Sequence, residues 1–369
     1  MSIIDRALAK SGASVSAMPP LDESLPLVTP QPAQSPDAAE PVAPSEPAIV
    51  KATPAAATVA PAATVAPAAV AATVPAATAV RPDPPRAAKA AAPPVLVVDD
   101  LRVSFPSRDG GRTEAVRGVS FSLGRERLGI VGESGSGKSQ TGRAILGLTA
   151  PEGIVTARRM EFHGTDLLHC SVKERRALRG GRIAMVLQDP KFSLNPVMSI
   201  GNQIVETLRA HSSVSGKQAR AKALAALEAV QIDQPERVYK LYPHEVSGGM
   251  GQRAMIAMML IADPELLIAD EPTSALDVTV QLQVLAILDR LVTDRGMGLV
   301  FISHDLRLVS TFCDRILVMY AGKVVEEVSS GALEDAKHPY TRGLLNCLPK
   351  LADNRHPLPT LDRKPEWAL

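Results

Sequence analysis

This sequence of 369 residues contains few cysteines and few aromatic residues, and its net charge is close to zero. The 40 basic and 39 acidic residues give a net charge of +1, so composition offers no support for nucleic acid as a partner. No run of about 18 apolar residues is present, and we expect no membrane span. The N-terminal sequence MSIIDRALAK carries an early acid and lacks an apolar core, so we expect no secretory signal. The three cysteines are odd in number and far apart, which is typical of reduced thiols that pack as small apolar residues: Cys170, Cys313 and Cys347.

The first 94 residues differ in composition from the rest of the chain. From about Pro19 to Pro94 the sequence is dominated by Ala, Pro, Val and Thr, with TVAPAA at 58–63 repeated at 64–69. Proline recurs too often for a helix, and alanine buries too little apolar area to offset the entropy of ordering. We therefore expect residues 1–94 to be a disordered tail and linker.

Folded structure is expected over residues 95–350, followed by a C-terminal tail at 351–369. The segment VLVVDDLRVSF reads as strand, turn and strand, and VSFSL as a further strand, which predicts antiparallel strands at the start. The apolar runs LGIV, RIAMVLQ, ELLIADE and GLVFISHD alternate with helical stretches, a pattern typical of a mostly parallel sheet covered by helices. A segment of about 197–262 has helical periodicity and predicts a helical subdomain inserted into this α/β fold.

The sequence GESGSGKS fits a phosphate-binding P-loop between a predicted strand and a predicted helix. Glycines let the backbone N–H groups of such a loop face phosphates at the N-terminus of the helix. The lysine would reach the β- and γ-phosphates, and the serine that follows would coordinate Mg²⁺. The predicted nucleotide-binding residues here are Gly132, Glu133, Ser134, Gly135, Ser136, Gly137, Lys138, Ser139 and Gln140.

The run ELLIADE ends in two acidic residues, Asp270 and Glu271, after an apolar strand. Ligands bind at the carboxyl ends of the strands in such sheets. We expect Asp270 to bind Mg²⁺ and Glu271 to be the general base that activates water. Acids at a strand end are more often simply solvated, so this pattern alone is weak.

The sequence VSGGMGQR supplies a second candidate phosphate site, because Ser247, Gly248 and Gly249 offer a hydroxyl and amides at a predicted helix start. With this motif the sequence resembles the ABC ATPase family over about residues 95–350. The resemblance implies that further residues serve the site. These are Gln188 in the Q-loop (catalytic and on the metal), Asp277 in the D-loop sequence SALD, catalytic His304, and Phe105 against the adenine ring.

Within that family, QDPKFSLNPVMSIGNQIVE, YPHEVSGGM and HPYTRGLLNCLP are similar to the importers of oligopeptides, dipeptides and nickel. Two features depart from the pattern. Gly251 stands where these importers usually carry a basic residue, and the chain ends at PEWAL without the cysteine cluster of many peptide importers. We therefore expect no iron–sulfur cluster.

The resemblance implies a complex at the cytoplasmic face of the cell membrane. Two ATPase subunits, identical or paralogous, would bind ATP between the P-loop of one and the SGG of the other. Two transmembrane permease subunits and an extracytoplasmic solute-binding protein would complete the importer. One alternative is a soluble ABC ATPase in translation, DNA repair or regulation, and another is a regulatory subunit with an inactive ATP site. The transported solute stays open: peptides, nickel complexes, opines or glutathione.

Overall fold

The computed structural model describes residues 93–188, 193–274, 276–348, 361 and 364–368. The predicted disordered tail at 1–94 lies outside the described residues except for its last two positions. The predicted C-terminal tail is described only at 361 and 364–368.

Eleven strands are described in this part of the chain. In order they are β1 (Leu96–Pro106), β2 (Arg112–Leu123), β3 (Arg127–Val131), β4 (Ile154–Thr156), β5 (Arg159–Phe162), β6 (Thr165–Asp166), β7 (Ile183–Val186), β8 (Leu266–Asp270), β9 (Gly298–Ser303), β10 (Arg315–Tyr320) and β11 (Lys323–Ser329). The α-helices are α2 (Lys138–Leu146), α3 (Val172–Leu178), α5 (Ile200–His211), α6 (Gly216–Ala229), α7 (Pro235–Lys240), α8 (Gly248–Leu260), α9 (Val278–Arg295), α10 (Leu306–Phe312) and α11 (Pro339–Cys347). Short 3₁₀ helices are η1 (Pro243–Glu245), η2 (Ser330–Asp335) and η3 (Pro365–Ala368).

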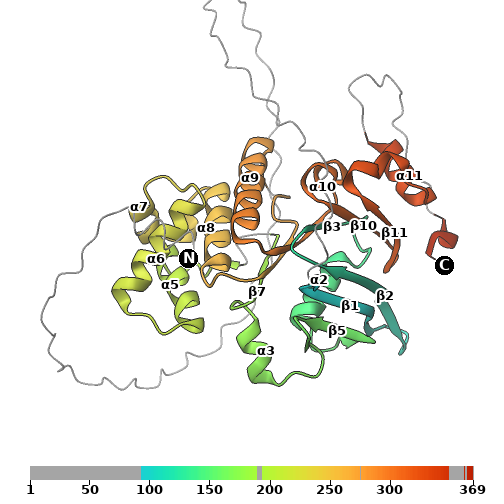
Figure 1. The fold of residues 1–369 in the computed structure, drawn as a ribbon, viewed down its shortest axis with the longest axis horizontal. Coiled ribbons are helices and arrows are strands. Elements are labelled where there is room, and N and C mark those ends of the chain that lie inside the picture. The colour runs from blue at the N-terminus through green and yellow to red at the C-terminus, as the bar shows by residue number, and fades with distance from the viewer. Residues whose placement is uncertain (1–92, 189–192, 275, 349–360, 362–363, 369) are drawn as a thin grey trace, which may run out of the picture. The chain divides into compact units, whose positions relative to one another are not determined.

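The predicted parallel sheet is confirmed. Its strand order is β11-β10-β3-β9-β8-β7, and every neighbouring pair is parallel except β10 and β11. Figure 1 labels β7, β3, β10 and β11 of this sheet. All four apolar runs predicted as strands lie in this sheet. The sheet also contains two strands that the sequence interpretation did not identify, β10 and β11. Strand β11 is partly exposed and pairs antiparallel with β10 at the edge.

Side chains alternate between the two faces of this sheet, because successive residues of a strand point to opposite sides. In β9, Val300 and Ile302 pack with the antiparallel strands and α2, whereas Leu299 and Phe301 pack with the helices on the other face. Both faces are therefore buried, which explains why the strands read as continuous apolar runs.

The N-terminal antiparallel sheet is also confirmed, with β2-β1-β5-β6 in order and β4 paired with β1. The predicted turn within VLVVDDLRVSF is wrong, since β1 runs through it as one strand. The register shifts between Val98 and Leu101, and Asp100 takes a φ of 51° there. This irregularity is a bulge, which bends the strand without ending it.

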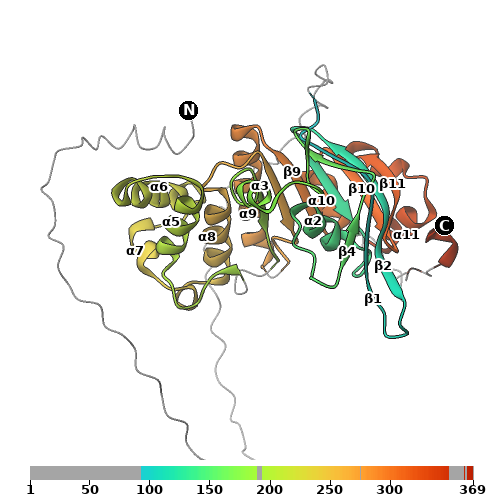
Figure 2. The ribbon, with the colours of Figure 1, turned by 90° about the horizontal axis from the view of Figure 1, so that it is seen from below.

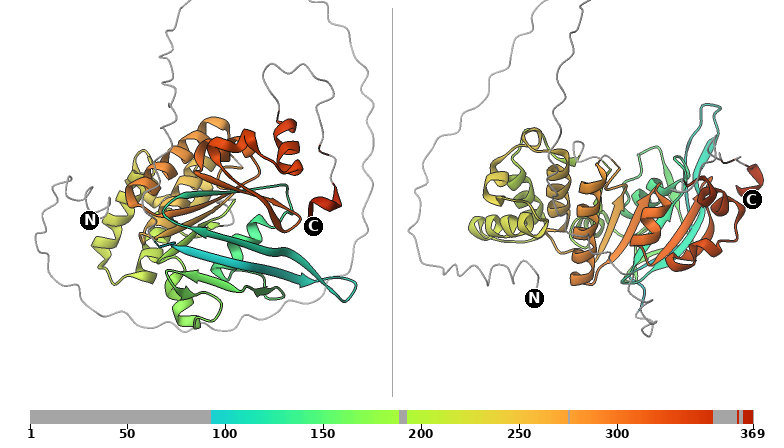
Figure 3. Two further views of the ribbon diagram at one scale, coloured as in Figure 1. Left: turned by 45° about the vertical axis from the view of Figure 1, so that its right-hand side comes forward. Right: turned by 90° about the horizontal axis from the view of Figure 1, so that it is seen from above.

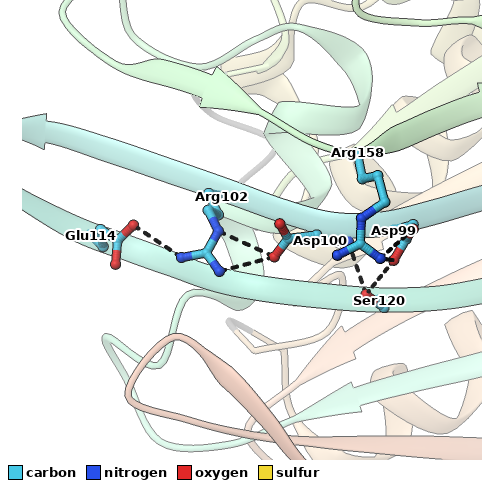
Figure 4. Close-up of polar contacts among 6 residues, drawn as sticks. All are labelled: Asp99, Asp100, Arg102, Glu114, Ser120 and Arg158. Atoms are coloured by element: carbon cyan, nitrogen blue, oxygen red, sulfur yellow. Dashed lines mark hydrogen bonds and ion pairs between the residues drawn. The ribbon is translucent and has the colours of Figure 1, made fainter.

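Polar contacts fix the bulge (Figure 4). The N–H of Asp100 donates to Ser120 Oγ (2.9 Å), and the Ser120 hydroxyl donates to Asp99 (3.2 Å). Arg102 pairs with Asp100 (3.0 Å) and Arg158 with Asp99 (3.2 Å). These pairs are largely exposed, so they set the local geometry more than they stabilise the fold.

Helices α5, α6, α7 and α8 form the expected helical segment and lie together, away from β1 and β2 (Figure 2). Helix α6 begins with a capping box in which Ser215 Oγ accepts from the N–H of Gln218, whose side chain accepts in return from the Ser215 N–H. Such reciprocal bonds satisfy N–H groups that a helix start leaves open.

The C-terminal elements pack beside the edge of the parallel sheet. Helix α11 and the turn η3, red in Figure 3, lie near β10 and β11, and η3 contacts β11. Among the described residues, no helix is both long enough and apolar enough to cross a bilayer.

Candidate nucleotide-binding site

The loop between β3 and α2 places the predicted P-loop at the carboxyl end of a central strand. Two positions in this loop must be glycine, because neighbouring backbone atoms leave no room for a Cβ. A Cβ at Gly132 would collide with the carbonyl oxygen of Met319, and a Cβ at Gly137, which has a φ of 99°, would lie 2.5 Å from that of Ala115. The loop is therefore held closely by its neighbours, and its last residue leads directly into α2.

Lys138 is almost fully buried, and its ammonium bends back over the loop. Nζ donates to the carbonyl oxygens of Gly132 (2.8 Å) and Glu133 (2.9 Å). Burial lowers the pKa of Lys138, and the nearby carboxylates of Glu271 and Asp270 oppose that shift. An ammonium held at a helix start among backbone dipoles is suited to an anionic ligand.

Ser139 and Asp270 meet at the entrance of α2. The Ser139 hydroxyl donates to Asp270 Oδ1 over 2.8 Å, and Asp270 is almost completely buried at the end of β8. Burial raises the pKa of Asp270, whereas the bond from Ser139 lowers it. A hydroxyl and a carboxylate oxygen are the donors that Mg²⁺ prefers, so this pair fits the predicted metal.

The hydroxyl of Ser136 supports the same fit. This Oγ is buried within the loop and has no hydrogen-bond partner among the described residues. Buried polar atoms are nearly always hydrogen-bonded, so this hydroxyl in the predicted phosphate-binding loop fits a site for a polar ligand.

Glu271 follows Asp270 and takes a left-handed backbone, with a φ of 48°. Its N–H donates to the carbonyl oxygen of Ile302 (2.9 Å). Its carboxylate lies between two residues that the sequence predicted to be catalytic: Gln188 Nε2 donates to Oε2 (3.1 Å), and His304 Nδ1 lies 3.3 Å from Oε1. Strained non-glycine residues of this kind gather at functional sites.

The residues of the second predicted phosphate site lie elsewhere in the fold. Ser247 precedes α8, its side chain is exposed, and its Oγ accepts from the N–H of Met250 (3.3 Å). Gly248 is also exposed, while Gly249 approaches Val280 so closely that a Cβ would lie 2.6 Å from it. Helix α8 packs on α5, α6 and β7, whereas α2 packs on β1, β2, β8 and β9, and Figures 1 and 2 show α8 and α2 apart. Among the described residues, the second predicted phosphate site therefore lies apart from the P-loop of the same chain.

Two further predicted residues have structural contacts of their own. Asp277 caps α9, where its side chain accepts from the N–H of Val280 (3.0 Å). Phe105, near the end of β1, is partly buried and its ring lies against Gly153. The remaining predicted positions in the P-loop differ in exposure: Glu133 and Gln140 are partly buried, and Ser134 and Gly135 are exposed.

Sequence reasoning missed three residues around the site. Gln252 on α8 is buried and donates to the carbonyl oxygen of Pro272, next to Glu271. Gly322, in the turn after β10, donates to the carbonyl oxygen of Ser136 (3.1 Å). Tyr340 on α11 accepts from the N–H of Glu133 (3.1 Å). The motif HPYTRGLLNCLP contains Tyr340, but nothing local in that motif indicates a contact so far along the chain.

Comparison with known proteins identifies the family. The sequence model described as "ABC transporter" matches residues 116–274. The chain is 47% identical over 270 residues to a putative peptide import ATP-binding protein of Brucella abortus (strain 2308), covering 73% of this chain and 81% of that protein. The chain belongs to the ABC transporter ATP-binding proteins. The chain is also 47% identical over 263 residues to the oligopeptide transport ATP-binding protein OppD of Bacillus subtilis (strain 168), covering 70% of this chain and 72% of that protein.

Solved structures agree with this assignment. The cassette is similar to the dimeric structure of MJ0796, a bacterial ABC transporter cassette, with a TM-score of 0.58 and 25% identity over 64% of this chain and 98% of that one. A second structure of MJ0796, described as a post-hydrolysis state bound to ADP and Pi, gives a TM-score of 0.56 and 26% identity. The predicted fold, that of an ABC ATPase with N-terminal antiparallel strands, a mostly parallel sheet and an inserted helical subdomain, is therefore confirmed.

Proposed function

We propose that this chain is the ATP-binding and ATP-hydrolysing subunit of an importer for peptides or related small solutes. One observation carries the ATPase proposal: Ser139 and Asp270 meet over 2.8 Å, and the next residue, Glu271, contacts Gln188 and His304. A metal-binding pair and a candidate base are thus adjacent beside a P-loop. The proposal of peptide import is supported by relatives named peptide import and oligopeptide transport ATP-binding proteins.

Each residue of the site has a separate role in binding or hydrolysing ATP. Lys138 and the N–H groups that open α2 would bind the phosphates, and Phe105 would pack against the adenine ring. Mg²⁺, held by Ser139, Asp270 and Gln188, would neutralise charge on the phosphates. Glu271 takes a proton from the attacking water. The water oxygen forms a bond to the γ-phosphorus, and the bond between that phosphorus and the ADP oxygen breaks. His304 and Gln188 orient Glu271 and the water.

Ser247, Gly248 and Gly249 have no place in this scheme within one chain. We place them, with Asp277, on the ATP bound by a second ATPase subunit, because they open an exposed helix start that can receive a phosphate from outside. Two permease subunits and an extracytoplasmic solute-binding protein complete the complex, with this subunit at the cytoplasmic face of the membrane. ATP that bridges two subunits favours the closed pair, and losing the γ-phosphate opens it.

The decisive experiment purifies the complex from its native membrane by a tag on this chain. We expect permease subunits and a solute-binding protein, whose bound ligand mass spectrometry identifies, and uptake of that ligand should stop when this gene is deleted. Recovery of ribosomal or DNA-repair proteins without permeases would favour the alternative of a soluble ABC ATPase. Purified protein without Mg²⁺-dependent ATP hydrolysis, alone or in the complex, would contradict the enzymatic part of the proposal.

A further inference from the structure

The C-terminal elements of the cassette form one wall of the P-loop. The carbonyl oxygen of Met319, in β10, lies against Gly132. The N–H of Gly322, in the turn after β10, donates to the carbonyl oxygen of Ser136 (3.1 Å). Tyr340, in α11, accepts from the N–H of Glu133 (3.1 Å). Two of these contacts are made by backbone atoms, and the third is made by a side chain.

The Tyr340 contact acts on one peptide group. The carbonyl of Gly132 and the N–H of Glu133 belong to the same peptide and point in opposite directions, because the group is planar and trans. The carbonyl accepts from Lys138 Nζ (2.8 Å) while the N–H donates to the Tyr340 hydroxyl. This peptide is therefore held between the lysine that binds phosphate and a tyrosine from the C-terminal helix.

Nucleotide binding changes the hydrogen bonds of this peptide group. Nζ of Lys138 has three N–H donors and gives two of them to the carbonyls of Gly132 and Glu133, so a phosphate that binds beside it competes with those carbonyls for the ammonium. The Tyr340 hydroxyl then limits rotation of the peptide, which glycine at position 132 would otherwise allow at low cost. Rotation would turn a carbonyl dipole towards other parts of the loop and disturb the amides that cradle the phosphates.

Tyr340 is itself held firmly. Its side chain is completely buried, and the N-terminus of α11 is anchored because Glu326 Oε1 accepts from the N–H groups of Lys337 (2.6 Å) and His338 (3.1 Å). Two aromatic rings pack around it: the ring centre of Tyr320 lies 4.5 Å away and that of Trp367 lies 6.0 Å away.

Trp367 connects this cluster to the end of the chain. It lies in η3, packs on Tyr320 with ring centres 6.0 Å apart, and is the one tryptophan in the whole sequence. Tyr320 also reaches this segment, since its hydroxyl donates to the carbonyl oxygen of Lys364 (3.5 Å). Tyr320, Tyr340 and Trp367 are called the aromatic cluster below.

We propose that Tyr340 is a positioning residue for ATP at the P-loop, and that the aromatic cluster couples the C-terminal segment to nucleotide binding. The proposal rests on ATP binding at this loop, as proposed above. The hydroxyl orients the peptide between residues 132 and 133, and the ring transmits any shift of that peptide to Trp367. Trp367 is thus a reporter built into the cassette.

The test compares Tyr340→Phe with Tyr320→Phe in the full-length protein. Each change removes one hydroxyl from the same cluster and keeps the ring, but only the first removes a bond to the P-loop. Losing a single hydrogen bond corresponds to about a three- to tenfold change in affinity. We expect Tyr340→Phe to raise the dissociation constant for ATP by at least threefold, with the KM for ATP rising more than kcat falls. Tyr320→Phe should leave the dissociation constant for ATP, the KM and kcat within twofold of the wild type.

Tryptophan emission supplies a readout that a purely structural role would not move. We expect saturating ATP to change the Trp367 emission of the wild type, and Trp367→Phe removes that signal as a check on its origin. Emission that does not respond to ATP would overturn the coupling. A Tyr340→Phe affinity within threefold of wild type, or an equal loss in Tyr320→Phe, would overturn the positioning role. Failure of the wild type to bind ATP at all would instead refute the proposed function, so the two failures are distinguishable.

Discussion

Nδ1 of His304 lies 3.3 Å from Oε1 of Glu271, although the two residues follow different strands. Strands β8 and β9 are parallel neighbours, with Asp270 paired to Ile302, so the residues just beyond them emerge at the same edge of the sheet. The other carboxylate oxygen of Glu271 accepts from Gln188, which follows the third strand of the group, β7. One carboxylate is therefore positioned by side chains from two other strand ends.

Replacing Glu271 with glutamine tests the proposed base. Glutamine keeps the shape but cannot take a proton from water, so we expect ATP binding close to that of wild type. Hydrolysis should fall by about 10²- to 10⁴-fold, the range that general-base catalysis typically contributes. Equilibrium dialysis with ATP and a phosphate-release assay measure the two quantities.

Glu265 supplies a matched control at the opposite end of the same strand. It precedes β8 and pairs with Arg182 (2.6 Å) and His163 (3.0 Å), remote from the strand ends that carry the site. Glu265→Gln should therefore hydrolyse ATP at nearly the wild-type rate. Near-normal turnover in Glu271→Gln would show that another group is the base.

Lys138→Ala tests the phosphate contact. We expect ATP affinity to fall by about 10- to 100-fold, because a hydrogen bond to a charged group contributes roughly 1.5–3 kcal/mol. Lys217, exposed on α6, is the control, and Lys217→Ala should bind ATP as the wild type does. Calorimetric titration with a non-hydrolysable ATP analogue measures both variants. Unchanged affinity in Lys138→Ala would assign the phosphates to other donors.

Glu265 also predicts a pH dependence of stability. The hydrogen bond from Arg182 lowers the pKa of this carboxyl in the folded protein. An acid with a lowered pKa stabilises the fold above its unfolded pKa and loses that contribution as the pH falls through the folded value. Glu265→Gln should thus lower the free energy of unfolding by less than about 1 kcal/mol at pH 7, because the pair is partly exposed. The difference should shrink as the pH falls below the usual glutamate range, and urea unfolding at pH 7 and pH 4 checks this. A difference that grows in acid would contradict the assignment.

The sequence is most informative where structure depends on local pattern. The apolar runs that became β3, β7, β8 and β9 are short and lie between helical segments, so a parallel sheet follows from them directly. Asp99 and Asp100 mislead the same reasoning because two adjacent acids favour a turn. The strand continues because the N–H of Asp100 finds Ser120 on β2, a partner 20 residues away that no local pattern shows.

The site divides in the same way. Glu271 was predicted from the end of its strand, and Gln188 and His304 from the family resemblance; the three meet because parallel strands end at one edge of a sheet. Tyr340 could not be predicted, because its partner Glu133 lies 207 positions earlier and the contact depends on how α11 packs. The capping role of Asp277 was missed for a different reason. The family motif SALD predicts that Asp277 contacts nucleotide. It does not show that Asp277 stands at the start of α9, where its side chain accepts from the N–H of Val280.

Ser247→Ala tests whether ATP sites are shared between subunits. Since the proposal assigns Ser247 to the ATP of a partner, losing its bond to a charged phosphate should slow turnover by roughly ten- to a hundredfold. The same change removes an N-cap from α8, which costs about 1 kcal/mol of stability. Ser215→Ala, which removes the N-cap of α6, is the matched control and should lose similar stability without losing turnover.

Mixing variants separates a shared site from an internal one. If the protein forms homodimers, a mixed dimer contains one Lys138→Ala chain and one Ser247→Ala chain. Both substitutions then fall in one shared site, and the other site is intact. Random exchange makes about half of the dimers mixed, so roughly a quarter of all sites should recover hydrolysis, given symmetric pairing. If the natural partner is a paralogue, replacing its own P-loop lysine alongside Ser247→Ala should likewise leave one site intact. An internal site predicts no recovery, since every chain then carries a lesion in its own site. Absence of recovery despite verified exchange would therefore exclude shared sites that act independently.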